Sequence, residues 1–322
     1  MNAELPANLR RPITIDFCNF GPGYPKTDNF FYHLLRSRFD VRLTDQPEFL
    51  LYTNPLNHMH RLHNCVRIYL AIESDLPDWS ECDYALTCHY LADPRHLRLP
   101  FYVLSGEAQR LVKEPQEAEQ VLAQKDRFCS FVVSNHHPRR NRNRADFFHR
   151  LSRYKRIDSA GTFLNNLGGP LPRGGDHKVQ FLRRYKFNIA FENGSIPGYT
   201  TEKIVEAMQA RCLPIYWGSP RIHEEFNPRS FLNYYDFPSE EALIERIIEL
   251  DQDDAKYLAV AREPYFHQNQ PNEFFDRERM LNFFAGIFTT PIRPVAERRS
   301  VLQLGRWLAV KQNKPHGPAR EA

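Results

Sequence analysis

One segment, Tyr185–Pro220, constrains the fold of this chain more than any other stretch. It begins with the apolar run Phe187–Phe191, which predicts a buried strand, and continues through a turn that carries two glycines. A helical stretch that begins near Glu202 follows, and the apolar run Leu213–Trp217 comes after it. A strand, a helix and a second strand in this order predict a parallel pair with a crossover helix, the unit of an α/β sheet.

The same alternation extends over most of the chain and divides it into two halves, joined by the charged, helix-prone stretch 106–127. Expected strands are 13–17, 48–52, 66–72, 84–87, 128–133, 187–191 and 213–217; expected helices are 29–38, 144–154, one from residue 202, 240–250 and 273–288; a turn is expected at 158–161. The predicted architecture is therefore two α/β halves, with a ligand cleft outside the carboxyl ends of the strands.

The composition permits a packed core and limits the class of protein. Hydrophobic residues make up 42% of the 322 residues and charged residues 25%, which excludes global disorder. The six cysteines form no C-x-x-C pair, and no secretory signal or bilayer-spanning apolar run accompanies them, so we expect reduced thiols in a cytosolic, soluble form. The net charge of +4 is compatible with an anionic small molecule, a membrane surface or a nucleic acid as partner.

The start of the predicted helix at Glu202 is a candidate phosphate site. Thr200 and Thr201 are expected to cap this helix, and the free N–H groups and positive dipole end of a helix suit an anion. Lys203 lies in the first turn, where a cation opposes the dipole. An isolated lysine there would be a solvated surface residue, but the glycine turn and the threonines favour an anion site. Glu202 either binds sugar hydroxyls or is an acid favoured in a first helical turn, and the pattern leaves both open.

Two further candidates follow predicted strands. The arginine-rich stretch 139–156 either binds nucleic acid or forms a solvated helix face with one functional member; its aromatic residues have the spacing of a buried helix stripe, and no nucleic-acid motif accompanies them. Arg144 is the favoured member, because one guanidinium can hold a diphosphate in bidentate fashion. Glu73, at the end of the strand expected at 66–72, is either a general base beside the cleft or a surface acid in a turn.

Signatures of metal and dinucleotide sites are missing from the sequence. The 13 histidines form no H-E-x-x-H pattern, no D-x-D motif follows a strand, and neither Walker A nor G-x-G-x-x-G occurs. The sequence therefore predicts no metal site and gives no support to a kinase or a dinucleotide enzyme.

Several ordered sequence blocks carry a family resemblance. They are V-R-I-Y-L-A-I-E-S (66–74), F-C-S-F-V-V-S-N (128–135), R-x-x-F-F-x-x-L (144–151), Y-K-F-N-I-A-F-E-N (185–193), Y-T-T-E-K (199–203), P-I-Y-W-G-S-P (214–220) and F-N-P-R-S-F (226–231). Together they are similar to the signature of the α-1,3-fucosyltransferases, glycosyltransferase family 10, and most of all to its bacterial, Lewis-antigen-type members.

The resemblance implies a GT-B fold, in which two Rossmann-like domains face each other across a cleft, with C-terminal helices. Residues 1–125 would form an acceptor-binding domain, 126–270 a GDP-fucose-binding domain, and 271–322 C-terminal helices and a basic tail. The implied activity is inverting transfer of L-fucose from GDP-β-L-fucose to the GlcNAc or Glc of N-acetyllactosamine-type acceptors, as in the synthesis of Lewis antigens and lipopolysaccharide O-antigens. The choice between α-1,3 and α-1,4 linkage stays open.

The resemblance also implies roles for the candidates in the second half. Arg144 and Lys203 would neutralise the diphosphate and act in catalysis. Asn193, Tyr199 and Glu202 would contact the nucleotide and the fucose. With these cations on the diphosphate, no metal cofactor is expected to be required, and Mn²⁺ or Mg²⁺ would at most stimulate the reaction.

Glu73 would be the catalytic base, although the residues around it are A-I-E-S where the family more usually has T-G-E-N. The expected partners are GDP-fucose and an oligosaccharide acceptor, and not nucleic acid. The competing class is a basic protein that binds nucleic acid or glycans without catalysis, and a related transferase for another GDP-sugar is a third alternative.

The stretch 298–320 intersperses apolar with basic residues. It is about equally suited to lie on an anionic membrane surface and to form a short docking helix with a disordered end. The expected location is the cytoplasm, with peripheral contact to the cytoplasmic face of the inner membrane as its membrane-bound form. The heptad-repeat array of many bacterial relatives is absent, which leaves the oligomeric state open.

Overall fold

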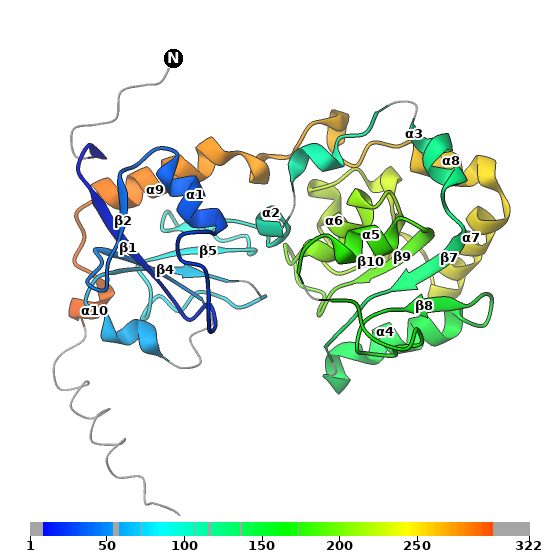
Figure 1. Ribbon diagram of the computed structural model, residues 1–322, viewed down its shortest axis with the longest axis horizontal. Coiled ribbons are helices and arrows are strands. Elements are labelled where there is room, and N and C mark those ends of the chain that lie inside the picture. Colours follow the sequence, from blue (N-terminus) through cyan, green and yellow to red (C-terminus); the bar gives the residue numbers. More distant parts are fainter. Residues whose placement is uncertain are drawn as a thin grey trace, which may run out of the picture. The chain divides into compact units, whose positions relative to one another are not determined.

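The structure is a computed structural model that describes residues 9–298 except 54–57, 72, 106, 115–116, 136 and 173. This part of the chain forms two compact units, each built on its own β-sheet (Figure 1). The first unit comprises residues 9–86, 93–97 and 280–298, and the second comprises 87–92 and 98–279. The expected α/β class, with two Rossmann-like halves, is confirmed.

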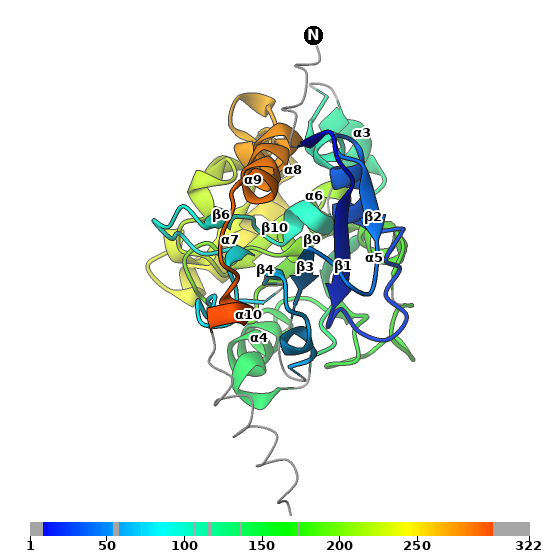
Figure 2. The same ribbon diagram turned by 90° about the vertical axis from the view of Figure 1, so that its left-hand side faces the viewer.

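The sheet of the first unit has the strand order β2-β1-β3-β4-β5-β6, and its pairs from β2 to β5 are parallel (Figure 2). Every residue of β3 and β5 is buried, as expected for strands covered on both faces. The elements of this unit are β1 (Ile13–Cys18), α1 (Phe30–Arg36), β2 (Val41–Leu43), β3 (Phe49–Tyr52), β4 (Val66–Leu70), β5 (Tyr84–Thr87), β6 (His96–Arg98), most of α9 (Arg277–Thr289) and α10 (Val295–Arg298).

Helix α9 follows the whole second sheet in sequence but packs beside α1 in the first unit (Figure 1). The ring of Phe284 lies 6.3 Å from that of Phe31 on α1, and the ring of Phe288 lies 4.7 Å from that of Phe49 on β3. The C-terminal amphipathic stretch thus completes the core of the N-terminal half.

The sheet of the second unit has the order β11-β10-β9-β7-β8, and all of its pairs are parallel. Its strands share one apolar cluster with α4, α7 and α8, and α5 and α6 contribute to another. The elements are α2 (Tyr102–Ser105), α3 (Glu117–Ala123), β7 (Arg127–Phe131), α4 (Pro138–Leu151), β8 (Ile157–Ser159), α5 (His177–Leu182), β9 (Tyr185–Phe191), α6 (Glu202–Gln209), β10 (Leu213–Trp217), β11 (Leu232–Asn233), α7 (Glu240–Gln252) and α8 (Asp254–Ala261).

The structure differs from the sequence-based expectations mainly at element ends and sheet edges. The turn expected at 158–161 is wrong at its start, because Ile157–Ser159 forms the buried edge strand β8 and pairs with β7. The helix expected at 144–154 begins earlier, at Pro138, whose fixed φ suits a first helical turn. The strand expected at 66–72 already ends at Leu70. Among the described residues, no helix is long and apolar enough to cross a membrane.

Candidate functional site

Strand β9 ends at the carboxyl edge of the second sheet and leads into the turn before α6. Glu192, the first residue after β9, is fully buried, and its N–H donates to the carbonyl of Trp217 at 2.7 Å. The turn requires a glycine, because Gly198 has φ +87° and a Cβ there would lie 2.2 Å from the carbonyl oxygen of Cys88. Since the carboxyl edge is where ligands of parallel sheets bind, this turn is placed for ligand contact.

Glu192 holds the start of α6. Its Oε1 accepts a hydrogen bond from the backbone N–H of Thr201 at 2.7 Å, and its Oε2 accepts one from the Thr201 hydroxyl, also at 2.7 Å. The expectation that a threonine hydroxyl caps α6 is wrong: Thr201 stands at the N-cap position, but its hydroxyl is engaged with Glu192. The first turn of α6 therefore begins at a carboxylate-anchored residue and carries no side-chain cap.

Lys203 lies between two carboxylates. Its Nζ is 3.1 Å from Glu192 Oε2 and 3.4 Å from Glu202 Oε1, and it donates to the Thr201 hydroxyl at 2.9 Å. Burial lowers the pKa of Lys203, but the two carboxylates raise it by more, so its pKa lies above the ordinary value. Burial raises the pKa of Glu202, but the positive charges of Lys203 and Lys178 lower it by more, so that its pKa is about 2. Lys203 and Glu202 are therefore both charged at neutral pH.

Arg144 reaches the same place from α4. Its side chain is fully buried, and Nη2 donates both to the carbonyl of Phe191 and to Oδ1 of Asn193, each at 2.8 Å. Asn193 Nδ2 in turn donates to the hydroxyl of Tyr199 at 3.4 Å. The positive charge of Arg144 also lowers the pKa of Lys203, as expected for two cations that lie near each other. The structure thus brings together at the end of β9 all the candidates of the second half: Arg144, Asn193, Tyr199, Glu202 and Lys203.

Glu73 belongs to the first unit. It is half-buried and lies three residues after Leu70, the last residue of β4. Its position is therefore near the carboxyl edge of its own sheet, the edge at which ligands of parallel sheets usually bind.

The sequence pattern gave no role to Glu192 and did not single out Gly218. A Cβ on Gly218 would lie 2.5 Å from Cγ of Glu192 and 2.4 Å from the hydroxyl of Tyr216, so only a glycine lets the turn after β10 pack against Glu192. One feature of the sequence could have identified Glu192: it is an ionisable residue directly after an apolar strand, in a segment that is a candidate anion site.

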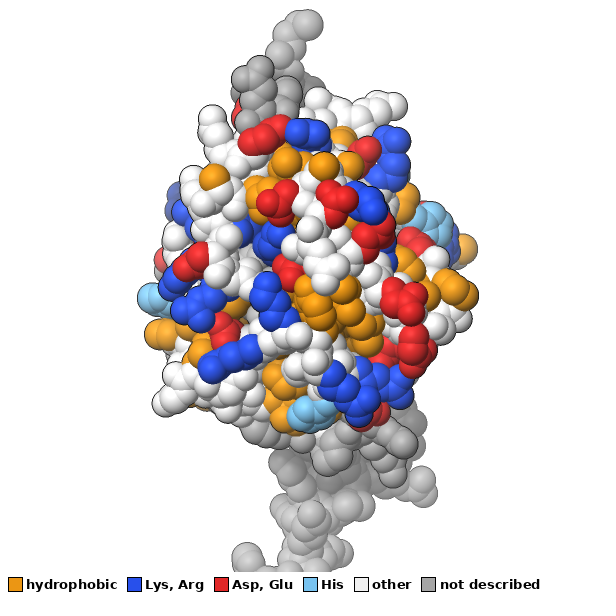
Figure 3. Space-filling view, turned by 90° about the vertical axis from the view of Figure 1, so that its right-hand side faces the viewer, with side chains coloured by type: hydrophobic (Ala, Val, Ile, Leu, Met, Phe, Trp, Pro, Cys, Tyr) orange, Lys and Arg blue, Asp and Glu red, His pale blue; other side chains and the backbone are white. Residues whose placement is uncertain are grey.

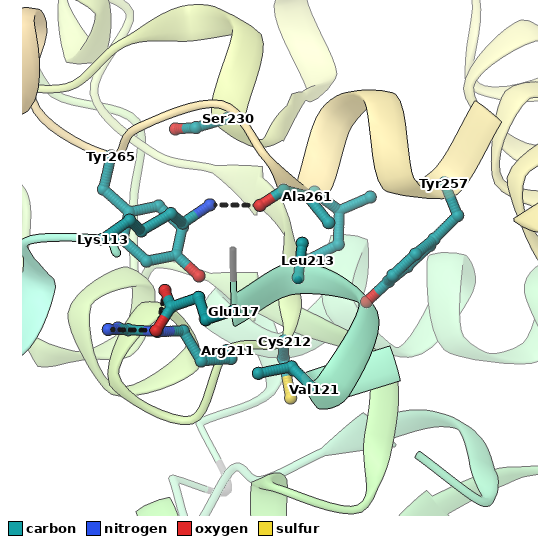
Figure 4. Close-up of a pocket in the computed structure, with 11 residues that line it drawn as sticks. Lys113, Glu117, Val121, Arg211, Cys212, Leu213, Ser230, Tyr257, Ala261 and Tyr265 are labelled. Atoms are coloured by element: carbon teal, nitrogen blue, oxygen red, sulfur yellow. Dashed lines mark hydrogen bonds and ion pairs between the residues drawn. The ribbon is translucent and has the colours of Figure 1, made fainter. Parts of the chain in front are cut away.

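A small pocket of the second unit lies elsewhere, at the amino end of β10 (Figure 4). It holds about 20 Å³, room for about one water molecule. Beside it, Nζ of Lys113 donates to the carbonyls of Ala261 and Glu263 at 2.7 and 2.6 Å and lies 3.7 Å from the ring centroid of Tyr265. Lys113 thus caps the C-terminal end of α8. The pocket is too small for a sugar nucleotide.

The face over α7 and α8 shows basic and acidic side chains interspersed, without a broad single-sign patch (Figure 3). Nucleic-acid binding usually requires a basic stripe, which this face does not offer. The side chains of Arg139, Arg140 and Arg142, and the stretch 299–320, lie outside the described residues. Within the described part of the chain, no three His, Cys, Asp or Glu side chains cluster as metal ligands.

Two family models match the chain. The alpha-(1,3)-fucosyltransferase FucT N-terminal domain matches residues 15–105, and the C-terminal domain of glycosyltransferase family 10 (fucosyltransferase) matches residues 122–270. The two matches cover the sequence blocks described above, and the resemblance drawn from those blocks is confirmed.

Individual proteins agree with these matches. The chain is 29% identical over 308 residues to the alpha-(1,3)-fucosyltransferase FucT of Helicobacter pylori, which covers 81% of this chain and 62% of that protein. It is 34% identical over 144 residues to the human 4-galactosyl-N-acetylglucosaminide 3-alpha-L-fucosyltransferase FUT6, covering 44% of this chain and 38% of that protein. The chain therefore spans less than two thirds of the length of these relatives.

Solved structures of an alpha1,3-fucosyltransferase resemble most of this chain. The crystal structure with GDP-fucose has a TM-score of 0.73 and 26% identity, and the match covers 91% of this chain and 96% of that one. The structure with GDP has a TM-score of 0.72, covering 93% and 96%. These matches confirm the expected GT-B class.

Proposed function

Because the chain belongs to glycosyltransferase family 10, the fucosyltransferases, we propose that it transfers L-fucose from GDP-β-L-fucose to a hydroxyl group of a sugar acceptor. The acceptor class that we propose is the GlcNAc or Glc of N-acetyllactosamine-type glycans, as in Lewis-antigen and lipopolysaccharide O-antigen synthesis. The relatives and the solved structures, whose names specify fucose transfer and GDP-fucose, support the donor.

The observation that carries the proposal is the convergence of two cations at the carboxyl end of β9. Arg144 and Lys203 come from different helices and are both held by buried polar partners next to the first turn of α6. A guanidinium, an ammonium and a helix N-terminus together suit a pyrophosphate. In this proposal the diphosphate binds there, and Asn193, Tyr199 and Glu202 contact the nucleotide and the fucose.

The proposed reaction inverts the anomeric carbon. The acceptor oxygen attacks this carbon from the face opposite the diphosphate, the bond to the β-phosphate oxygen breaks, and the acceptor proton passes to the carboxylate of Glu73. Negative charge grows on the leaving GDP in an oxocarbenium-like transition state. Fixed cations at Arg144 and Lys203 stabilise that charge more in the transition state than in the ground state.

The same cations make a metal ion dispensable in this proposal, so Mn²⁺ or Mg²⁺ would stimulate turnover at most. The location that we propose is the cytoplasm. Contact of residues 298–320 with the cytoplasmic face of the membrane can be tested by co-sedimentation of full-length and 1–297 protein with anionic liposomes. Equal pelleting of the two proteins would exclude that contact.

The test of the proposed function is direct incubation with GDP-fucose and N-acetyllactosamine, followed by detection of GDP and of the fucosylated product by mass spectrometry. We expect both products, with and without EDTA. Parallel reactions with GDP-mannose identify a transferase for another donor. Binding of GDP-fucose without release of GDP, over a range of acceptors, would contradict the enzymatic proposal.

A further inference from the structure

Arg98 and Glu225 form a buried ion pair that contacts the turn joining β9 to α6. Nη2 of Arg98 lies 2.5 Å from Oε1 of Glu225, and the two side chains are only 8% and 0% exposed. The guanidinium is stacked between the rings of Tyr90 and Phe274, with centroid distances of 4.1 and 4.3 Å. All four residues belong to the second unit, although Arg98 is the last residue of β6.

Both members of the pair contact the turn directly. Arg98 Nη2 reaches the carbonyl of Gly198 at 3.4 Å, and Glu225 Oε1 accepts a hydrogen bond from the hydroxyl of Thr200 at 3.3 Å. The N–H of Gly198 donates to the hydroxyl of Ser219 at 2.9 Å. The residues on either side of Tyr199 are therefore fixed by buried polar groups, and the backbone of the turn has little freedom to move.

Stability alone is a weak reason for such a pair. Two charges removed from water lose their hydration, and replacing a buried ion pair by apolar side chains of similar size is often neutral or even stabilising. What an apolar pair cannot supply is a directional hold on the carbonyl of Gly198 and the hydroxyl of Thr200. The pair therefore contributes less to the stability of the fold than to fixing the conformation of the turn.

We infer that Arg98 and Glu225 are positioning residues for the sugar nucleotide: they hold residues 198–201 in the conformation that presents Tyr199 and the first turn of α6 to the ligand. This inference rests on the proposed function. Neither residue needs to touch the ligand. Without the pair, part of the binding free energy would be used to order the turn, and the affinity for the nucleotide would fall.

The test compares wild-type protein with Arg98→Met, Glu225→Met and the double variant. Each single change leaves one buried charge unpaired and is expected to lower the urea midpoint strongly. The double variant is expected to regain most of that stability, yet to bind GDP at least about 10-fold more weakly by calorimetry, because the polar hold on the turn is gone. The KM for GDP-fucose rises in parallel, while the KM for the acceptor stays unchanged.

A matched control removes another Arg–Glu pair of the same unit. Arg211, which follows the C-terminal end of α6, lies 2.8 Å from Glu117, and the two side chains are 20% and 24% exposed. The double variant Arg211→Met/Glu117→Met is expected to lose stability but to keep the GDP affinity. If Arg98→Met/Glu225→Met does not fold, Thr200→Val replaces it as the test. Valine preserves the shape of threonine and removes the hydroxyl that bonds to Glu225 and to Tyr216, so weaker GDP binding is again expected.

The outcomes separate the inference from the proposed function. Wild-type affinity for GDP in the folded test variant would overturn the inference and leave the proposed function standing. An equal loss of affinity in the Arg211/Glu117 control would also overturn it, because general loosening would then explain the effect. Failure of the wild-type protein to bind GDP would overturn both.

Discussion

The carboxylate of Glu192 lies 3.1 Å from the ammonium of Lys203, inside the site that we assign to a diphosphate. The cation proposed to meet the ligand thus has its own counter-charge, supplied by a fully buried acid at the end of β9. An unpaired ammonium in such surroundings would be costly, because burial removes its hydration. Glu192 therefore helps to keep Lys203 charged.

Glu192→Gln removes this counter-charge while preserving the shape of the side chain. We expect a loss of stability of about 1–3 kcal/mol, because the buried ammonium of Lys203 loses one of its two carboxylate partners and keeps only Glu202. Added GDP should restore more of the thermal midpoint in the variant than it adds to the wild-type protein, since the diphosphate replaces the missing negative charge. Thermal unfolding with and without saturating GDP measures both effects. An identical GDP-induced shift in the two proteins would contradict the assignment of the diphosphate beside Lys203.

Lys203→Ala removes the ammonium from the same place. Because fixed positive charge is needed most as GDP departs, we expect turnover to fall on the order of 10²–10³-fold, together with weaker GDP binding. Lys256→Ala is the control: its Nζ lies 2.6 Å from Glu249, and its side chain is half exposed. Steady-state kinetics and calorimetry of both variants provide the measurement. Equal kinetics in the two variants would exclude Lys203 from the site.

The parts of the fold that could be predicted from the sequence are those with a local pattern. The apolar runs that became β7, β9 and β10 are long enough to be recognised, but β2 and β8 are three-residue edge strands that exist only because neighbouring strands accept them. The grouping of candidates at the end of β9 was also predictable, because Lys203 and its turn are contiguous in the sequence. Arg98 and Glu225 could not be found this way, because 127 positions separate them and only the folded chain brings them together.

Glu73→Gln tests the proposed base. The amide cannot take a proton from the acceptor hydroxyl, so turnover should fall by about 10²–10⁴-fold while GDP binds as in the wild-type protein. Asp75→Asn, two residues away and exposed, is the matched control and should retain activity. Single-turnover assays with preloaded GDP-fucose separate chemistry from donor binding. Wild-type turnover in Glu73→Gln would assign the base to another residue.

The pKa of Lys113, outside the proposed site, predicts a pH-dependent contribution to stability (Figure 4). Burial lowers its pKa to about 7 in the folded protein, whereas an unfolded lysine has a pKa of about 10.4. Between these values the unfolded chain binds more protons, so the folded state gains stability as the pH rises from about 7 toward about 10.

The stability difference between wild-type protein and Lys113→Met should therefore increase between pH 7 and pH 9.5, on the order of 2 kcal/mol in favour of the wild type. Urea unfolding at the two pH values measures it. Lys256→Met, at a half-exposed surface lysine, should show no such increase. A pH-independent difference for Lys113→Met would mean that the buried ammonium keeps its ordinary pKa.

Gly198→Ala tests whether the conformation of the turn, rather than its chemistry, sets nucleotide affinity. An alanine at position 198 would have to adopt φ +87°, and its Cβ would lie 2.2 Å from the backbone oxygen of Cys88, so the turn must shift. Gly194→Ala changes the same turn where no atom lies within 4 Å of the added Cβ and φ is not positive. We expect at least about 10-fold weaker GDP binding for Gly198→Ala, equivalent to about 1.4 kcal/mol, and near wild-type binding for Gly194→Ala. Calorimetry on folded, monodisperse samples decides between them. Equal affinities would show that nucleotide binding tolerates a displaced turn, which would also remove the physical basis for a positioning role of Arg98 and Glu225.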